Sequence, residues 1–231
     1  MTEFAALVLA GGRGSRMGLD TPKQFLEYRG KPLFLWSALE FLRAGMPVTL
    51  VFSPEDLERA KEEAARFGEE IAETGQRLDF TAGGKERFES SFLGLQHLKE
   101  QGGCRYVLIH DAARPFVTAE VIGRAKDCVK EFGTAVAAVP SVDTVKIADE
   151  AGIVRETPDR SRVFIIQTPQ AFGFSELFSA YEAMFSAPER TFTVTDDSSV
   201  MERVKNAEIR LFRGDYANIK ITTPEDLKYL Q

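Results

Sequence analysis

Glycines and basic residues gather directly after the first apolar run of the chain. Residues 5–10 are apolar, and residues 11–18 hold four glycines and two arginines, one of which is Arg16. Lys23 follows five residues after Gly18. Glycine lets a backbone turn tightly and approach a ligand closely, and the N–H groups of such a loop can bind an anion. Because arginine adds directional charge, these residues predict a polyphosphate site at the end of a first strand.

The spacing of these glycines excludes the two commonest phosphate motifs. A P-loop needs two glycines five positions apart followed by Lys and Ser or Thr, and the loop has no such pair. The dinucleotide fingerprint needs a third glycine where Met17 follows Gly12 and Gly14. A plain glycine turn with solvated arginines is the alternative to a phosphate site at this point.

A second glycine loop follows residues 78–82, which are predicted to form a short strand. Gly83 and Gly84 stand beside Lys85 and Arg87. The carboxyl ends of parallel strands lie at one edge of a sheet, so we expect this loop beside the first. An ordinary strand–helix turn is the alternative, and the shared edge favours a ligand-binding loop.

A carboxylate follows the clearest buried strand, residues 106–109. Asp111 stands beyond the carboxyl end of this strand, where ligands bind in an open α/β sheet. Mg²⁺ is commonly held by one or two carboxylates together with substrate phosphates. Asp111 is therefore predicted to bind Mg²⁺, with capping of the next helix or pairing with Arg114 as the alternative. We interpret His110 as a hydrogen-bonded structural residue.

The elements that must position these loops alternate between strands and helices. This alternation predicts an α/β fold with a mainly parallel sheet covered on both faces. Ser53 is interpreted as the N-cap of a helix that runs to about Phe67, and residues 68–77 as a loop. Strands are expected at residues 5–10, 47–52, 78–82, 106–109, 134–139, 163–166 and 208–212, and helices at about 32–45, 53–67, 90–99, 121–132, 175–185, 197–204 and from 223 onward.

One segment departs from this alternation. Residues 141–157 alternate between polar and apolar around a turn at residues 149–152, which predicts a β-hairpin. An isolated hairpin is marginally stable in water, so we expect an arm that packs on a second copy of the chain, or that folds back on its own domain. The remaining pattern contains no repeat or linker, and residues 1–231 are expected to form a single domain with this arm.

Composition restricts the class of protein. The chain has 231 residues, a net charge of −6 and a sequence pI of about 5.2, which argues against a nucleic-acid binder because such proteins carry basic faces. Its two cysteines, Cys104 and Cys128, match no metal or redox spacing and favour a reducing compartment, so we expect a cytoplasmic protein. No apolar run approaches the length of about 20 residues that a membrane span requires.

Residues 9–18 with Lys23 and Gln24 resemble the signature of sugar-phosphate nucleotidyltransferases. Further motifs, in order along nearly the whole chain, resemble the 2-C-methyl-D-erythritol 4-phosphate cytidylyltransferase family. They lie at residues 84–90, 110–115, 143–144, 159–160, 167–170, 195–196 and 218–220. The resemblance implies a Rossmann-like fold of the nucleotide-diphospho-sugar transferase type, a homodimer joined through the hairpin arm, and CTP with Mg²⁺ as co-substrate and metal.

The resemblance also implies a role for each matching residue. Arg16 and Lys23 would hold the triphosphate and act in catalysis together with Lys220. Thr144 and Arg160 would enter the site of the partner subunit. The CTP site would comprise Ala10, Gly11, Gly12, Gly14, Gly84, Lys85, Arg87, Ser90, Asp111 and Ala112, and the polyol phosphate site Asp111, Arg114, Thr144, Arg160, Thr168, Thr195 and Lys220. Lys85 departs from the acidic or small residue expected there, and Asp197 and Ser198 replace a more usual Glu-Ala pair.

The chemistry implied by the family needs cations more than it needs a general base. The acceptor's phosphate oxygen attacks the α-phosphorus of CTP, and pyrophosphate leaves. Because the attacking group is already an anion, catalysis must bring two anions together and stabilise the charge between them. Basic residues at the predicted loops of an acidic protein fit that requirement.

Two rival functions share parts of this pattern. A ribitol 5-phosphate cytidylyltransferase would share most motifs, although Ala113 favours methylerythritol because ribitol enzymes tend to carry a larger residue there. A non-catalytic regulator would bind CTP without releasing pyrophosphate, and the set of Arg16, Lys23, Asp111 and Lys220 argues against it. The chain ends soon after the last motif, so we expect it to lack the cyclodiphosphate synthase domain to which some family members are fused.

Overall fold

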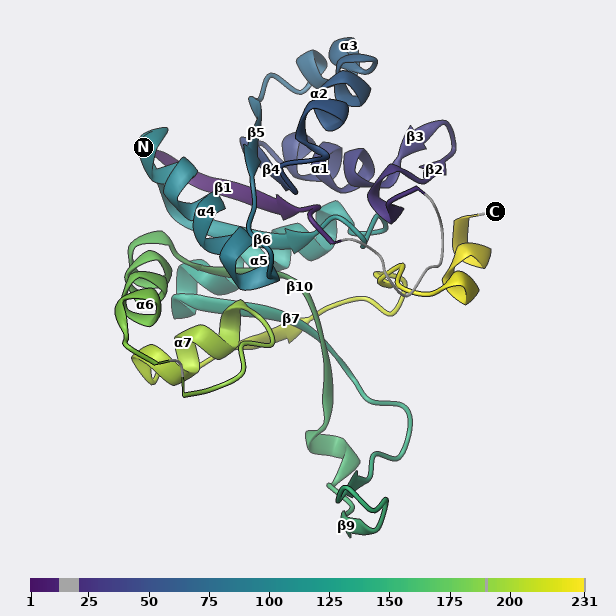
Figure 1. The fold of residues 1–231 in the computed structure, drawn as a ribbon, viewed down its shortest axis with the longest axis vertical. Helices are drawn as coiled ribbons and strands as arrows, with labels where there is room; N and C mark the ends of the chain where they lie inside the picture. Colours follow the sequence, from purple (N-terminus) through teal and green to yellow (C-terminus); the bar gives the residue numbers. More distant parts are fainter. Residues whose placement is uncertain (13–20, 190, 231) are drawn as a thin grey trace.

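The computed structural model describes residues 1–12, 21–189 and 191–230, so Gly14 and Arg16 lie outside the described residues. The described part forms a seven-stranded sheet in the order β11-β7-β10-β6-β1-β4-β5 (Figure 1). Only β10 runs antiparallel to its neighbours β6 and β7 within this sheet. The prediction of a mixed, mainly parallel sheet with helices on both faces is confirmed. The strands span Thr2–Leu9 (β1), Val48–Phe52 (β4), Leu78–Ala82 (β5), Cys104–Asp111 (β6), Thr134–Pro140 (β7), Phe164–Gly173 (β10) and Leu211–Arg213 (β11).

Helices cover both faces of this sheet because alternate residues of a strand point to opposite sides. Phe4, Ala6 and Val8 of β1 pack in one apolar core, and Leu7 and Leu9 pack in the other. The first core is completed by α1 (Leu33–Arg43), α2 (Leu57–Ala65) and α5 (Ala119–Phe132), and the second by α4 (Arg87–Glu100), α6 (Phe174–Ser186) and α7 (Asp197–Lys205). Among the described residues, no helix has the length and apolarity needed to cross a membrane.

The local structure differs from the sequence predictions around residues 53–77. Ser53 does not cap a long helix: its hydroxyl accepts the Asp56 N–H at 3.3 Å within a turn, and α2 begins only at Leu57. The predicted loop at residues 68–77 is wrong in its first half, because Gly68–Glu73 forms the short helix α3. This helix buries none of its residues fully, so it lacked the apolar periodicity by which longer helices are recognised.

A small β-hairpin at residues 27–32 was not predicted from the sequence. Strands β2 (Glu27–Tyr28) and β3 (Lys31–Pro32) pair around Arg29 and Gly30, both of which have positive φ. Positive φ at two central residues is the geometry of a tight two-residue hairpin turn. The last strand, β11, lies at Leu211–Arg213 rather than at residues 208–212, and the C-terminal turn is a 3-10 helix, Pro224–Leu230.

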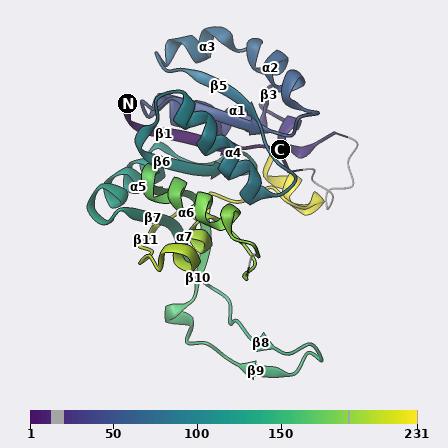
Figure 2. The same cartoon turned by 60° about the vertical axis from the view of Figure 1, so that its left-hand side comes forward.

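The predicted arm leaves the body of the molecule between β7 and β10. It carries the antiparallel strands β8 (Ile147–Ala148) and β9 (Val154–Glu156), and Figure 2 shows it extending well away from the sheet. Thus the predicted hairpin exists, and it does not fold back against the sheet.

Candidate active site

The loops after four parallel strands line one pocket at the carboxyl edge of the sheet. These strands are β1, β4, β5 and β6, and the C-terminal segment that follows β11 completes the wall. The pocket has a volume of about 780 Å³, within the range of small-molecule binding sites. It collects the predicted residues Ala10, Gly11, Gly12, Lys23, Gly84, Lys85, Arg87, Ser90, Asp111, Ala112 and Lys220.

Asp111 is the carboxylate of this pocket that follows β6, and it is held by two cations. Arg87 Nε donates to its Oδ1 at 3.1 Å, and Lys220 Nζ donates to its Oδ2 at 2.7 Å. Burial alone would raise the pKa of Asp111, but the charges of Arg87 and Lys220 outweigh burial and hold this pKa well below its usual range. The carboxylate is therefore ionised at neutral pH. The alternative pairing of Asp111 with Arg114 is not observed, because the Arg114 guanidinium donates to main-chain oxygens of Asn218 and Ile166. The cations that contact the Asp111 carboxylate come from α4 and from the C-terminal segment.

The C-terminal segment brings Lys220 to this carboxylate. Ile221 N–H donates to the Ala113 oxygen at 2.8 Å, which fixes the segment beside the end of β6. Lys23 Nζ in turn donates to the main-chain oxygen of Ile221 at 3.3 Å, so the two predicted catalytic lysines lie on neighbouring parts of one wall. Because an anion attracts both positive charges, an anion bound between these two lysines would be stabilised by each of them.

The loop after β5 is held by Ser90, which is buried at the start of α4. Gly84 N–H donates to Ser90 Oγ at 3.1 Å, and Lys85 N–H donates to Glu89 Oε2 at 2.7 Å. A Cβ at Gly83 would lie 2.6 Å from Ser90 Oγ, closer than real Cβ atoms approach. Glycine is therefore needed for the close approach of this loop to α4, while the Lys85 side chain is exposed at the pocket.

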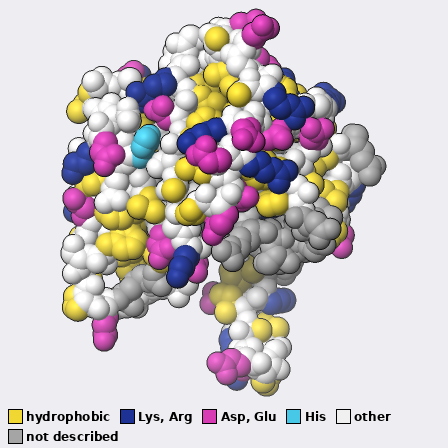
Figure 3. All heavy atoms as spheres, turned by 45° about the horizontal axis from the view of Figure 1, so that its top comes forward, with side chains coloured by type: hydrophobic (Ala, Val, Ile, Leu, Met, Phe, Trp, Pro, Cys, Tyr) yellow, Lys and Arg dark blue, Asp and Glu magenta, His cyan; other side chains and the backbone are white. Residues whose placement is uncertain are grey.

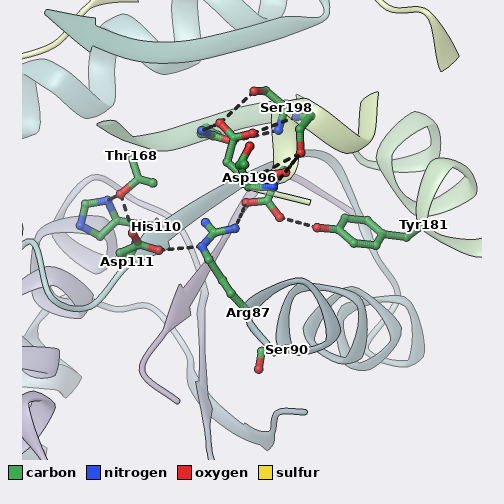
Figure 4. Close-up of polar contacts among 12 residues, drawn as sticks. Arg87, Ser90, His110, Asp111, Thr168, Tyr181, Asp196 and Ser198 are labelled. Carbon is green, nitrogen blue, oxygen red and sulfur yellow. Dashed lines mark hydrogen bonds and ion pairs between the residues drawn. The ribbon is translucent and has the colours of Figure 1, made fainter. Parts of the chain in front are cut away.

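A buried hydrogen-bonded chain lies behind Asp111. His110 Nε2 contacts the Arg114 oxygen at 3.1 Å, and because a carbonyl only accepts, Nε2 carries the proton. His110 Nδ1 then accepts from the Thr168 hydroxyl at 3.0 Å, and Thr168 Oγ1 accepts the Asp111 N–H at 3.1 Å. Burial lowers the pKa of His110 to about 4, so the imidazole is neutral. Figure 4 shows Thr168, His110 and Asp111 side by side.

Comparisons with known proteins identify the family of this chain. The sequence profile of the 2-C-methyl-D-erythritol 4-phosphate cytidylyltransferase family matches residues 4–231. The chain belongs to this family. It is therefore a cytidylyltransferase, an enzyme of the nucleotidyltransferase class.

Relatives and solved structures cover nearly the whole enzyme. The 2-C-methyl-D-erythritol 4-phosphate cytidylyltransferase of Lachnospira eligens is 39% identical to this chain over 226 residues, which is 96% of this chain and 95% of the relative. Another of that name, from Geobacillus kaustophilus, is 39% identical over 230 residues, with 99% and 95% covered. The crystal structure of 4-diphosphocytidyl-2C-methyl-D-erythritol synthase from Anaerococcus prevotii superposes with a TM-score of 0.81 at 29% identity, covering 99% of this chain and 94% of that one.

Five of the residues predicted to bind the acceptor lie farther apart in this cytidylyltransferase than those predicted to bind CTP. Thr168 is buried behind Asp111, and Arg114 lies beside Asn218. Thr195 is exposed directly before α7, where its N–H donates to Ser199 Oγ. Thr144 and Arg160 are exposed on or beside the arm, and none of these five residues lines the pocket formed by the described residues.

The segment after β4 also forms part of the pocket wall of the enzyme, which the sequence patterns did not predict. Ser53, Pro54 and Glu55 follow β4 and line the pocket beside the β1 and β5 loops. The signal was available, because β4 is parallel to β1 and its carboxyl end must lie at the same edge. Ser53 and Pro54 also resemble the start of a helix, so they were interpreted as a helix cap and not as part of a binding pocket.

Proposed function

We propose that the enzyme transfers CMP from CTP to 2-C-methyl-D-erythritol 4-phosphate, giving 4-diphosphocytidyl-2-C-methyl-D-erythritol and pyrophosphate, in non-mevalonate isoprenoid precursor biosynthesis. Family membership supports this reaction, and the names of the relatives specify the acceptor. The observation that carries the proposal is that Lys23, Lys220 and Asp111 line one pocket, with Lys220 bound to Asp111 and Lys23 bound to the main-chain oxygen of the next residue, Ile221.

The proposed reaction joins two phosphates and needs no general base. An oxygen of the acceptor phosphate attacks the α-phosphorus of CTP, the bond from that phosphorus to the bridging oxygen breaks, and pyrophosphate leaves with the electron pair. Lys23 and Lys220 would stabilise the charge that gathers on the phosphate oxygens. The loops after β1 and β5 would hold the nucleotide, with Ser90 fixing the Gly84 backbone. Arg16 would add a further cation, and its position lies outside the described residues.

Mg²⁺ is part of the proposal, with Asp111 as its protein ligand. Among the described residues, no group of three or more His, Cys, Asp or Glu side chains could hold a metal ion. Each oxygen of Asp111 accepts one side-chain contact and keeps a further lone pair, so the carboxylate fits an ion that is held mainly by the triphosphate. When bound, Mg²⁺ would neutralise charge on the phosphate oxygens.

The arm supports the proposal of a homodimer. Its short strands expose apolar side chains that neither the body nor the hairpin covers, and Figure 3 shows apolar and charged side chains together on the arm. An exposed apolar surface of this kind marks an interface. The exposed apolar residues of the arm and its base are Val142, Ile147, Ile153, Val154, Phe164, Ile165 and Ile166.

Dimerisation would bring Thr144 and Arg160 to the partner's acceptor site. The double variant Ile153→Asp/Val154→Asp should sediment as a monomer and lose activity, whereas Leu93→Asp, at an exposed apolar position on α4, should stay dimeric. A wild-type protein that sediments as a monomer at micromolar concentration would contradict this part of the proposal. We also place the enzyme in the cytoplasm, a proposal that its two free cysteines support.

The experiment that tests the reaction measures pyrophosphate release with CTP and Mg²⁺. Methylerythritol 4-phosphate and ribitol 5-phosphate are compared as acceptors. Release with the first alone is expected, and release with the second alone would retain the chemistry but change the substrate. Binding of CTP without release in either case would indicate a regulator. Lys23→Ala should lower kcat by about a hundredfold, as expected for one preorganised electrostatic group.

A further inference from the structure

A second carboxylate, Asp197, is buried beside the pocket without lining it. It is the first residue of α7 and is fully buried. A buried charge must be paired, and both oxygens of Asp197 are. Arg87 Nη1 donates to Oδ2 at 2.7 Å, and the Tyr181 hydroxyl donates to Oδ1 at 2.7 Å.

Arg87 connects this carboxylate to Asp111, which lines the pocket. Its Nη1 contacts Asp197 while its Nε contacts Asp111 Oδ1, so one guanidinium bridges two carboxylates (Figure 4). A guanidinium is planar and rigid, and fixing one of its nitrogens orients the others. The position of Asp197 therefore sets the direction from which Arg87 donates to Asp111.

The start of α7 is itself fixed to the central sheet. Gln170 of β10 donates Nε2 to Asp196 Oδ2 at 2.8 Å and accepts the Ser198 N–H at 3.0 Å. Gln170 pairs with Ile109 of β6, the strand that ends at Asp111. Asp197 and Asp111 are thus held in one frame, through Gln170 on one side and Arg87 on the other.

We propose that Asp197 is a positioning residue for the transfer reaction and acts through Arg87. It holds Arg87 in the orientation that fixes Asp111 Oδ1, while Asp111 Oδ2 accepts from Lys220. Without Asp197, Arg87 would turn away, and Asp111 would be free to move with Lys220 out of line with the phosphates. This inference rests on the proposed function.

The first test is Asp197→Asn, which keeps the shape of the side chain and removes its charge. We expect kcat to fall by about tenfold or more, as for other partners that orient a functional group, with a smaller change in the KM for CTP. An unchanged kcat would overturn the inference. Tyr181→Phe is the matched control, because it also damages the buried cluster but keeps the contact between Asp197 and Arg87. Its kcat should stay near the wild-type value, and a fall equal to that of Asp197→Asn would contradict positioning through Arg87.

A double-mutant cycle tests the route of the effect. In Arg87→Met, kcat should be low, and adding Asp197→Asn should lower it no further because the link is already lost. An equal additional fall would overturn the inference. If Arg87→Met does not fold because Asp197 is left unpaired, the double variant, which removes both charges, is compared directly with Asp197→Asn, and similar kcat values are expected. Wild-type protein that releases no pyrophosphate would refute the proposed function and this inference with it, whereas an active wild type with a fully active Asp197→Asn would refute the inference alone.

Discussion

Lys220 Nζ lies 2.7 Å from Asp111 Oδ2, although 109 residues separate the two in the chain. The contact joins the C-terminal segment to the end of β6 in the wall of the pocket. Asp111 is almost buried while Lys220 is more exposed, with side-chain exposures of 11% and 38%. The lysine side chain is therefore accessible to solvent, and its amino group is held by the buried carboxylate.

Replacing this lysine should impair the reaction more than the fold. Lys220→Met keeps the apolar stem and removes the charge, so we expect kcat to fall by about a hundredfold. Asp111 keeps its contact with Arg87, and the variant should unfold in urea near the wild-type midpoint. Lys228→Met, at an exposed lysine of the same C-terminal segment, is the control and should retain full activity. A Lys220→Met enzyme with wild-type kcat would exclude the catalytic role.

His110 should make stability depend on pH in acid. Its pKa is lowered from 6.5 to about 4 by burial, so below pH 6.5 the unfolded chain binds a proton that the folded one does not. The stabilisation is complete above pH 6.5 and is lost as the pH falls towards 4, with a total of about 3 kcal/mol. Urea unfolding followed by Trp36 fluorescence should show a shallower pH dependence in His110→Gln. The same slope in both proteins would contradict this assignment.

Gly83 should tolerate no side chain. A Cβ there would lie 2.6 Å from Ser90 Oγ and 3.1 Å from Val51 Cγ1, so Gly83→Ala must displace the loop that holds Gly84. We expect a loss of about 1–3 kcal/mol in the free energy of unfolding and weaker CTP binding by calorimetry. Gly123→Ala is the control, because it lies in α5 with open space around it and should be neutral or stabilising. CTP affinity equal to wild type in Gly83→Ala would show that the loop is not part of the site.

Asn218 should matter through Lys220. It is fully buried, and its Nδ2 donates to the Thr168 oxygen at 2.8 Å, which ties the segment before Lys220 to β10. Asn218→Ala should lower both kcat and the free energy of unfolding, because it leaves the Thr168 oxygen unpaired and releases the segment. If kcat, measured at a temperature where the variant is fully folded, equals that of wild type, this tie does not position the lysine.

Local pattern was enough to predict most of the framework. Apolar runs that stop at glycine or at a charged residue identified β1, β5 and β6, because a buried strand needs only a short apolar stretch and a break. The alternation of strands and helices then implied a shared carboxyl edge, and so placed the loops at Gly11, Gly84 and Asp111 together. The helix α3 and the hairpin β2–β3 were missed since both are too short for a periodic signal.

The sequence by itself determined the residue types that the chemistry requires, the strands that carry them and the edge at which they meet. Only the tertiary structure decided their partners. Three sets of contacts depend on elements that pack together from distant parts of the chain. Arg87 bridges Asp111 and Asp197, and the Thr168 hydroxyl donates to His110. Lys23 and Lys220 lie on one wall of the pocket. Periodicity describes only neighbours along the chain, whereas these contacts depend on how the cores on the two faces of the sheet are filled.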